Sequence, residues 1–149
     1  MPRVLFVCSS DRTRAPIAAA LFHAAAKAAG MEDELTCDSA GIRAQHGQHI
    51  ADGVIAVLAE KGIEPRRIGV QMLSPKLIKA AELILVMTSD QEKEITTNFI
   101  SARNKTKTLM SVMRSDADVF DPNHCSLEKF RACRDMMEPA INELVERLQ

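Results

Sequence analysis

The sequence is poor in aromatic side chains. Its 149 residues include five phenylalanines and neither tyrosine nor tryptophan, so few rings are available to line a ligand site. No apolar stretch reaches the length of a membrane span, and the first residues lack the layout of a signal peptide. The net charge of −1 gives no reason to expect binding to nucleic acid or to a membrane surface. These absences favour a cytoplasmic protein.

Cysteine is also sparse. The four cysteines are Cys8, Cys37, Cys125 and Cys133. None of them forms a Cys-x-x-Cys pair, which disfavours a zinc ribbon or a thioredoxin-type motif. In a reducing cytoplasm the four side chains are expected to be free thiols.

Strand-like and helix-like segments alternate along the chain. This alternation is typical of a parallel sheet with helices on both faces. We therefore predict one three-layer α/β domain over residues 1–149, with a four-stranded parallel sheet and ligands bound beyond the carboxyl ends of the strands. The expected strands are 3–7, 35–39, 82–87 and 106–110, and the expected helices are 15–29, 51–61, 75–80, 89–100 and 126–148. In the helix at 51–61, one apolar side is expected to contain Val54, Ile55, Val57 and Leu58.

The loop after the first strand carries the clearest chemical signal. Cys8 ends an apolar strand, five residues follow, and Arg14 then stands at the start of an alanine-rich helix. A strand, loop and helix start in this order present several backbone N–H groups to an anion. A cysteine there is expected to have a lowered pKa, and the arginine fork fits phosphate oxygens. The loop therefore predicts a phosphate site with Cys8 as nucleophile.

Cleavage of a phosphate ester also needs an acid that protonates the leaving oxygen. Asp121 is our choice, because it lies in the loop between the last strand and the last helix. Pro122 restricts the backbone of Asp121 to extended conformations and so helps to aim its side chain. Asp116 and Asp118 are expected to be solvated loop charges.

Several segments together resemble the low-molecular-weight protein tyrosine phosphatase family. The first is Val-Leu-Phe-Val-Cys8 with Arg14 and Pro16, followed by a helix with Ala-Leu-Phe. The others are Asp38-Ser39-Ala40-Gly41, the apolar segment 81–87 and Asp121-Pro122. The resemblance covers essentially the whole chain in order, and it implies the same α/β fold.

The resemblance implies a mechanism without a metal or another cofactor. Cys8 would attack phosphorus and form a phosphocysteine, and Asp121 would act first as acid and then as base. The partner would be a phosphorylated protein or a small phosphate ester, and the oligomeric state is not indicated. The implied phosphate-binding residues are Ser9, Ser10, Asp11, Arg12, Thr13 and Arg14.

The loop departs from the pattern of the family at four positions. Ser10 replaces a glycine, which has a cost if its φ must be positive. Asp11 replaces an asparagine that braces the loop, and the charge of Asp11 is expected to point away from phosphate or to be offset by Arg12 or another cation. Ala15 replaces a serine that supports the thiolate, which predicts a raised Cys8 pKa and slow turnover. Thr13 replaces the second loop cysteine.

The substrate crevice is also expected to be unusual. Asn123 and His124 stand where the family has a tyrosine after Asp-Pro, and Gln45 and His46 lie in the loop where relatives often carry an aromatic residue. Missing rings reduce stacking on a phenyl phosphate. A preference for phosphotyrosine therefore does not follow, and Arg12 at the loop apex offers a site for a second negative charge.

Three other functions remain open at this point. An arsenate reductase of the same fold would need Cys125 and Cys133 to meet near the site. A non-catalytic module would bind phosphate without cleaving it. A metal site would use His46, His49, His124 and Cys125, but the His-x-x-His spacing in a loop is weak evidence, and surface histidines are expected.

Overall fold

Four short strands pair in parallel to form one sheet in a computed structural model that describes residues 2–149. The strands are β1 (Arg3–Cys8), β2 (Thr36–Gly41), β3 (Leu83–Val86) and β4 (Thr106–Thr108). Their order across the sheet is β2-β1-β3-β4, so the first strand lies in the interior. The predicted four-stranded parallel sheet in a single α/β domain is confirmed.

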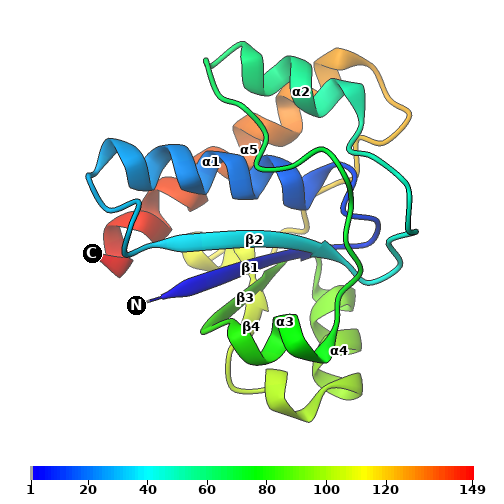
Figure 1. The fold of residues 1–149 in the computed structure, drawn as a ribbon, viewed down its shortest axis with the longest axis vertical. Helices are drawn as coiled ribbons and strands as arrows, with labels where there is room; N and C mark the ends of the chain where they lie inside the picture. The colour runs from blue at the N-terminus through cyan, green and yellow to red at the C-terminus, as the bar shows by residue number, and fades with distance from the viewer. Residues whose placement is uncertain (1) are drawn as a thin grey trace.

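Helices cover both faces of this sheet (Figure 1). The α-helices are α1 (Arg14–Ala28), α2 (Asp52–Ala59), α3 (Pro75–Ala80), α4 (Ser89–Asn98) and α5 (Leu127–Leu148). Two short 3-10 helices are η1 (Ile100–Ala102) and η2 (Leu109–Met113). The helices α1, α2 and α5 lie on one side of the sheet, and α3 and α4 lie on the other. The three-layer architecture follows from the sequence as expected.

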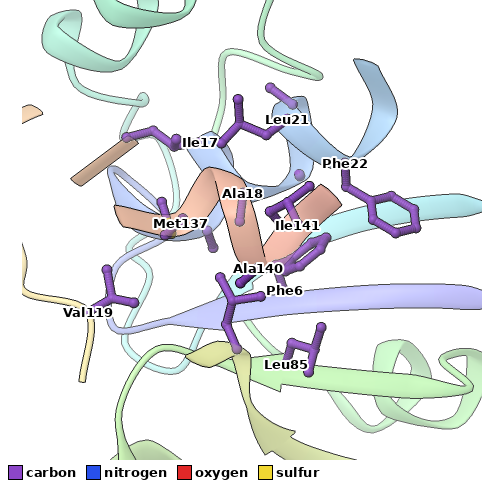
Figure 2. Close-up of a cluster of buried hydrophobic side chains, with 14 of the residues drawn as sticks. Phe6, Ile17, Ala18, Leu21, Phe22, Leu85, Val119, Met137, Ala140 and Ile141 are labelled. Carbon is purple, nitrogen blue, oxygen red and sulfur yellow. The ribbon is translucent and has the colours of Figure 1, made fainter. Parts of the chain in front are cut away.

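The residues of β1 alternate between two hydrophobic cores. Phe6 and Cys8 belong to the core beneath α1 and α5, whereas Leu5 and Val7 belong to the core on the opposite face. Both faces of a parallel strand are buried in this architecture, which explains why the strand is an unbroken apolar run. Figure 2 shows Phe6 among side chains of α1 and α5, and its ring meets that of Phe22 edge-on at 5.7 Å between centroids.

Side-chain hydrogen bonds cap the starts of α3 and α4. The Ser74 hydroxyl accepts a hydrogen bond from the Leu77 N–H at 3.3 Å and caps α3, which is the predicted start. Thr88 and Gln91 form a capping box at the start of α4. The last strand is shorter than predicted, because the chain turns into η2 at Leu109.

One predicted core position is wrong. Val54, Val57 and Leu58 are buried, but Ile55 is 38% exposed. Residues 54, 57 and 58 share one face of a helix, and the next position after 54 is rotated by about 100° away from it. None of the helices within residues 2–149 has the length and apolar character needed to cross a membrane.

The end of β2 touches the loop that follows β1. Gly41 pairs with Cys8 in the sheet, and its α-carbon faces the backbone of residues 9–11. A Cβ atom on Gly41 would lie 2.7 Å from the Asp11 nitrogen and 2.8 Å from the Ser9 carbonyl oxygen. Backbone atoms cannot move aside as a flexible side chain can, so this position requires glycine.

We expect Gly41→Ala to lower the free energy of unfolding by about 1–3 kcal/mol, because the added methyl overpacks against backbone. It should also weaken binding of inorganic phosphate, since residues 9–11 must shift. Urea denaturation and calorimetric titration with phosphate measure the two effects.

The matched control is Gly69→Ala, because a Cβ at Gly69 meets no heavy atom within 4 Å. We expect this variant to stay within about 0.5 kcal/mol of the parent. Equal stability and equal phosphate affinity of the two variants would contradict the close approach at Gly41.

Candidate active site

The loop of residues 9–13 is held from outside by the backbone of neighbouring segments. The Cys8 carbonyl accepts from the Ile42 N–H at 2.9 Å, and the Ser9 carbonyl accepts from the Arg43 N–H at 2.7 Å. The Arg12 carbonyl accepts from the Ala51 N–H at 2.9 Å. Three carbonyls of the segment 8–12 are therefore tied to these neighbours.

Cys8 lies at the base of this loop and is 1% exposed. Burial raises the pKa of the Cys8 thiol, while the N–H groups of Ala15 and Asp11 and the charge of Arg14 act in the opposite direction. The negative charge of Asp11 raises this pKa further. The general prediction of a lowered pKa at a helix start is therefore wrong here, because desolvation outweighs the donors around the sulfur.

Arg14 begins α1, and its side chain is buried beside the loop. Its Nη1 donates to the Val119 carbonyl at 2.9 Å, and its Nη2 lies 3.7 Å from Asp121 Oδ2. Its Nε is buried and has no hydrogen-bond partner within residues 2–149. A buried guanidinium N–H without a partner is costly, so an oxyanion in the loop would supply the acceptor that Arg14 lacks.

Asp121 reaches the same site from the far end of the sequence. Its Oδ1 accepts from the Thr13 hydroxyl at 2.8 Å and from the Asn123 N–H at 3.0 Å. Its side chain is 39% exposed, whereas Thr13 is buried. The structure thus brings the predicted acid to the loop that holds Cys8, with Thr13 as its contact.

Val119 anchors the segment that carries Asp121. The Val119 side chain is fully buried among residues of α1 and α5 (Figure 2), and its N–H donates to the Met87 carbonyl at 2.8 Å. Its own carbonyl accepts from Arg14. Asp118 was expected to be only a solvated charge, but its Oδ1 accepts from the Ser89 N–H at the start of α4 at 2.9 Å.

Asp11 is the strained residue of the loop. Its φ is +58°, whereas Ser10 is not among the residues with positive φ, so the cost expected for Ser10 falls on Asp11 instead. Asp11 is 1% exposed, and its Oδ2 accepts from the Gln71 N–H at 2.9 Å and from Arg67 Nη2 at 3.3 Å. Its charge is therefore offset by Arg67, and Arg12 takes no part.

Arg67 links this carboxylate to β2. Its Nη2 also lies 3.1 Å from Asp38 Oδ1 and donates to the Ser39 carbonyl. A second support comes from Gln91, whose Nε2 donates to the Ser9 hydroxyl at 3.3 Å while its Oε1 accepts from the Met87 N–H. The loop is thus braced from both sides of the sheet edge.

A pocket of about 550 Å³ lies beside the loop. Of the four residues predicted for the substrate crevice, Asn123 and His124 line this pocket, and Gln45 and His46 do not. Their role in binding a substrate stays a prediction. The chain turns so that residues 47–53 form this wall instead. The full lining is Arg12, Gly47, Gln48, His49, Ile50, Ala51, Asp52, Gly53, Asn123, His124, Cys125 and Phe130.

The remaining cysteines do not pair with Cys8. Cys125 is exposed at the pocket, and Cys133 is buried on α5. Burial raises the pKa of Cys133 to about 12. All four cysteines are free thiols, and across residues 2–149 the structure groups no three histidine, cysteine, aspartate or glutamate side chains in a geometry suited to a metal ion.

Sequence reasoning missed four residues that position the site, namely Arg67, Gln71, Gln91 and Val119. Arg67 and Gln71 lie in a segment without a recognisable pattern, and they act through contacts that only folding creates. The Thr-x-x-Gln spacing of Thr88 and Gln91 announces a helix start, but nothing in it indicates a contact with Ser9.

Comparisons with known proteins show a family that covers nearly the whole chain. The model of one protein family, described as "Low molecular weight phosphotyrosine protein phosphatase", matches residues 3–149. The protein-arginine-phosphatase of Geobacillus stearothermophilus is 38% identical over 148 residues, which cover 99% of this chain and 96% of that protein. All residues of the site lie within these matched ranges.

Two solved structures are also similar. The low molecular weight protein tyrosine phosphatase from T. tengcongensis has a TM-score of 0.93 and 27% identity, covering 99% of each chain. A cysteine-to-serine mutant of YwlE arginine phosphatase with a phosphorylated active site serine has a TM-score of 0.92 and 29% identity, covering 98% of this chain and 95% of that one.

The burial of Asp11 predicts a stability effect with a defined pH dependence. Burial raises the pKa of Asp11 above its usual 3.8, so the folded state favours the protonated form. The contribution of Asp11 to the free energy of unfolding is therefore highest at low pH, and it falls as the pH rises through the raised pKa. The substitution Asp11→Asn removes the group that titrates. We therefore expect it to raise the free energy of unfolding at pH 7 by about 1 kcal/mol.

Thermal unfolding from pH 4 to pH 8 measures this effect. The gain of Asp11→Asn over the parent should shrink as the pH falls towards 3.8. The control Asp116→Asn changes an exposed carboxylate and should give no such trend. A gain that does not vary with pH, or a loss at pH 7, would contradict the assignment.

Proposed function

The chain belongs to the low molecular weight phosphotyrosine protein phosphatase family, and we propose that it hydrolyses phosphorylated protein residues or small phosphate esters through a phosphocysteine intermediate. It is a cysteine-based phosphatase of that family's type. One arrangement carries the proposal: Cys8 lies beneath loop N–H groups, beside the unpaired Nε of Arg14, with Asp121 joined to the same loop by Thr13.

In the first step, the Cys8 thiolate attacks phosphorus and an S–P bond forms. The loop N–H groups and Arg14 hold the equatorial oxygens, which carry the charge in the transition state. The bond from phosphorus to the leaving group breaks, and Asp121 gives its proton to the leaving atom.

In the second step, water attacks the phosphorus of the phosphocysteine. Asp121, now a carboxylate, takes a proton from this water. The S–P bond breaks, Cys8 returns as a thiolate, and inorganic phosphate leaves. A phosphorylated active site serine in a mutant of the similar YwlE arginine phosphatase supports a covalent step at this position.

Two substrates deserve a direct comparison. Phosphotyrosine is favoured by the family description. Phosphoarginine is the second candidate, because relatives at 38% and 30% identity over nearly the whole chain are named protein-arginine-phosphatase. The pocket offers one phenylalanine, one isoleucine and otherwise small or polar residues, so stacking gives a phenyl group little advantage. These relatives carry phosphatase names, which lends no support to an arsenate reductase.

We further propose that turnover is slow and that the protein acts in a reducing cytoplasm. Burial and the charge of Asp11 raise the pKa of Cys8, which reduces the fraction of thiolate at neutral pH. Ala15 has no hydroxyl that would stabilise the thiolate. The four free thiols are compatible with a reducing compartment.

The decisive measurement is the kcat for phenyl phosphate and for p-nitrophenyl phosphate. It is made on three proteins, namely the parent, Cys8→Ser and Asp121→Asn. Cys8→Ser should lose at least about a thousandfold in kcat, because it removes the nucleophile. Asp121→Asn should lose about a hundredfold on phenyl phosphate and clearly less on p-nitrophenyl phosphate, because nitrophenolate leaves without a proton. Quenched reactions should also yield a phosphorylated peptide that contains Cys8.

Equal rates of the parent and Cys8→Ser would refute the phosphatase mechanism. Binding of inorganic phosphate without turnover of either ester would indicate a phosphate-binding module instead. The same loss of rate on both esters in Asp121→Asn would remove Asp121 as the acid. Peptides with phosphotyrosine and phosphoarginine, assayed side by side, decide between the two substrates.

Thr13 provides a separate test, because it contacts the acid and not the thiol. Thr13→Val removes the 2.8 Å hydrogen bond to Asp121 at almost constant volume. We expect kcat on phenyl phosphate to fall about tenfold, with little change in inhibition by inorganic phosphate. Thr13→Ser keeps the hydroxyl and should keep most of the activity. If Thr13→Val and Thr13→Ser have the same kcat on phenyl phosphate, Thr13 does not position Asp121.

A further inference from the structure

The pocket beside the loop has a charge distribution that the hydrolysis mechanism does not explain. Arg12 reaches this pocket from the loop, and Asn123 reaches it from the segment that carries Asp121. The Asn123 N–H donates to Asp121 Oδ1, so the pocket begins next to the acid. A leaving group that receives its proton from Asp121 therefore departs on the side of Arg12.

The side chain of Arg12 is fixed across this pocket. Its Nε donates to the His49 carbonyl at 2.9 Å, and its Nη1 donates to Asn123 Oδ1 at 3.3 Å. These contacts join the two walls of the pocket and use only part of the fork. Within the described residues, Arg12 Nη2 makes no hydrogen bond, and no carboxylate oxygen lies within 4.0 Å of the guanidinium nitrogens.

The charge of Arg12 is therefore not neutralised by a partner in the pocket. The one carboxylate among the lining residues is Asp52, which lies in the first turn of α2. The free N–H groups of a helix start favour a negative charge there. Asp52 thus lies where a helix start favours its charge, and Arg12 is left without an ion-pair partner among the described residues.

We infer that Arg12 selects substrates whose leaving group carries a second anion, a carboxylate in the simplest case, close to the phosphorylated atom. A planar guanidinium held in place with free N–H donors binds a carboxylate with charge-assisted hydrogen bonds. The same charge disfavours a leaving group that is itself cationic. This inference rests on the proposed phosphatase function and adds a residue that determines specificity.

Two esters of equal size test this inference, namely 3-carboxyphenyl phosphate and its neutral carboxamide. The measured quantity is the ratio of kcat/KM for the carboxylate to that for the carboxamide. Intrinsic reactivity of the esters cancels when this ratio is compared between variants. We expect Arg12→Met to lower the ratio about five- to tenfold relative to the parent, and Arg12→Lys to give an intermediate ratio because it keeps the charge without the fork.

Two controls accompany the variants. Arg103→Met removes an exposed positive charge whose side chain donates to the Thr96 carbonyl and does not line the pocket, and it should leave the ratio unchanged. Higher ionic strength should lower the ratio in the parent and not in Arg12→Met, since salt screens a partly exposed charge pair.

Binding of the two corresponding phosphonates, which cannot be hydrolysed, gives the same comparison without turnover. A preference for the carboxylate phosphonate that Arg12→Met abolishes supports the inference even if no ester is hydrolysed, in which case the proposed function alone fails. Equal loss of both ligands in Arg12→Met would mean that Arg12 only joins the walls of the pocket, and it would overturn the inference. An unchanged ratio in Arg12→Met would overturn it as well.

Discussion

The carboxylate of Asp11 is buried under the loop that follows β1, where Arg67 and the Gln71 N–H hold it. A φ of +58° at this residue reverses the direction of the backbone, and the N–H of Asp11 is thereby aimed at Cys8. A non-glycine residue adopts this conformation only where its surroundings compensate for the cost. The shape of the loop, and with it the binding of an oxyanion, depends on the contacts that this one buried side chain makes.

The buried carboxyl of Asp11 also has a chemical consequence for Cys8, the candidate nucleophile. The charge of Asp11 lies close enough to Cys8 to raise the pKa of the thiol. Arg14 opposes this effect from the other side, because it stands at the start of α1 with one buried N–H unpaired. Asp11 therefore has two opposite effects. Its contacts hold the loop in shape, whereas its negative charge destabilises the thiolate of Cys8.

The candidate acid, Asp121, is placed by the hydrophobic core more than by the loop. Val119 is buried against α1 and α5 (Figure 2), and its backbone forms hydrogen bonds with Met87, the residue directly after β3, and with Arg14. Asp121 follows two residues later and meets Thr13. Residues more than a hundred positions apart therefore meet because one valine fills the core at this edge of the sheet.

The sequence by itself determined the layers of the fold, and it indicated Cys8, Arg14 and Asp121 as the candidate reacting groups. Apolar runs of strand length, the helix cap at Ser74 and the spacing from Cys8 to Arg14 can be recognised in a short stretch of sequence, because none of them needs a contact with a distant segment. The sequence did not determine that residues 47–53, and not Gln45 and His46, line the pocket. It also did not determine that Arg67 forms an ion pair with Asp11. These were decided by the tertiary structure, because a hydrogen bond or an ion pair between distant segments has no periodicity and exists only once packing brings both ends together.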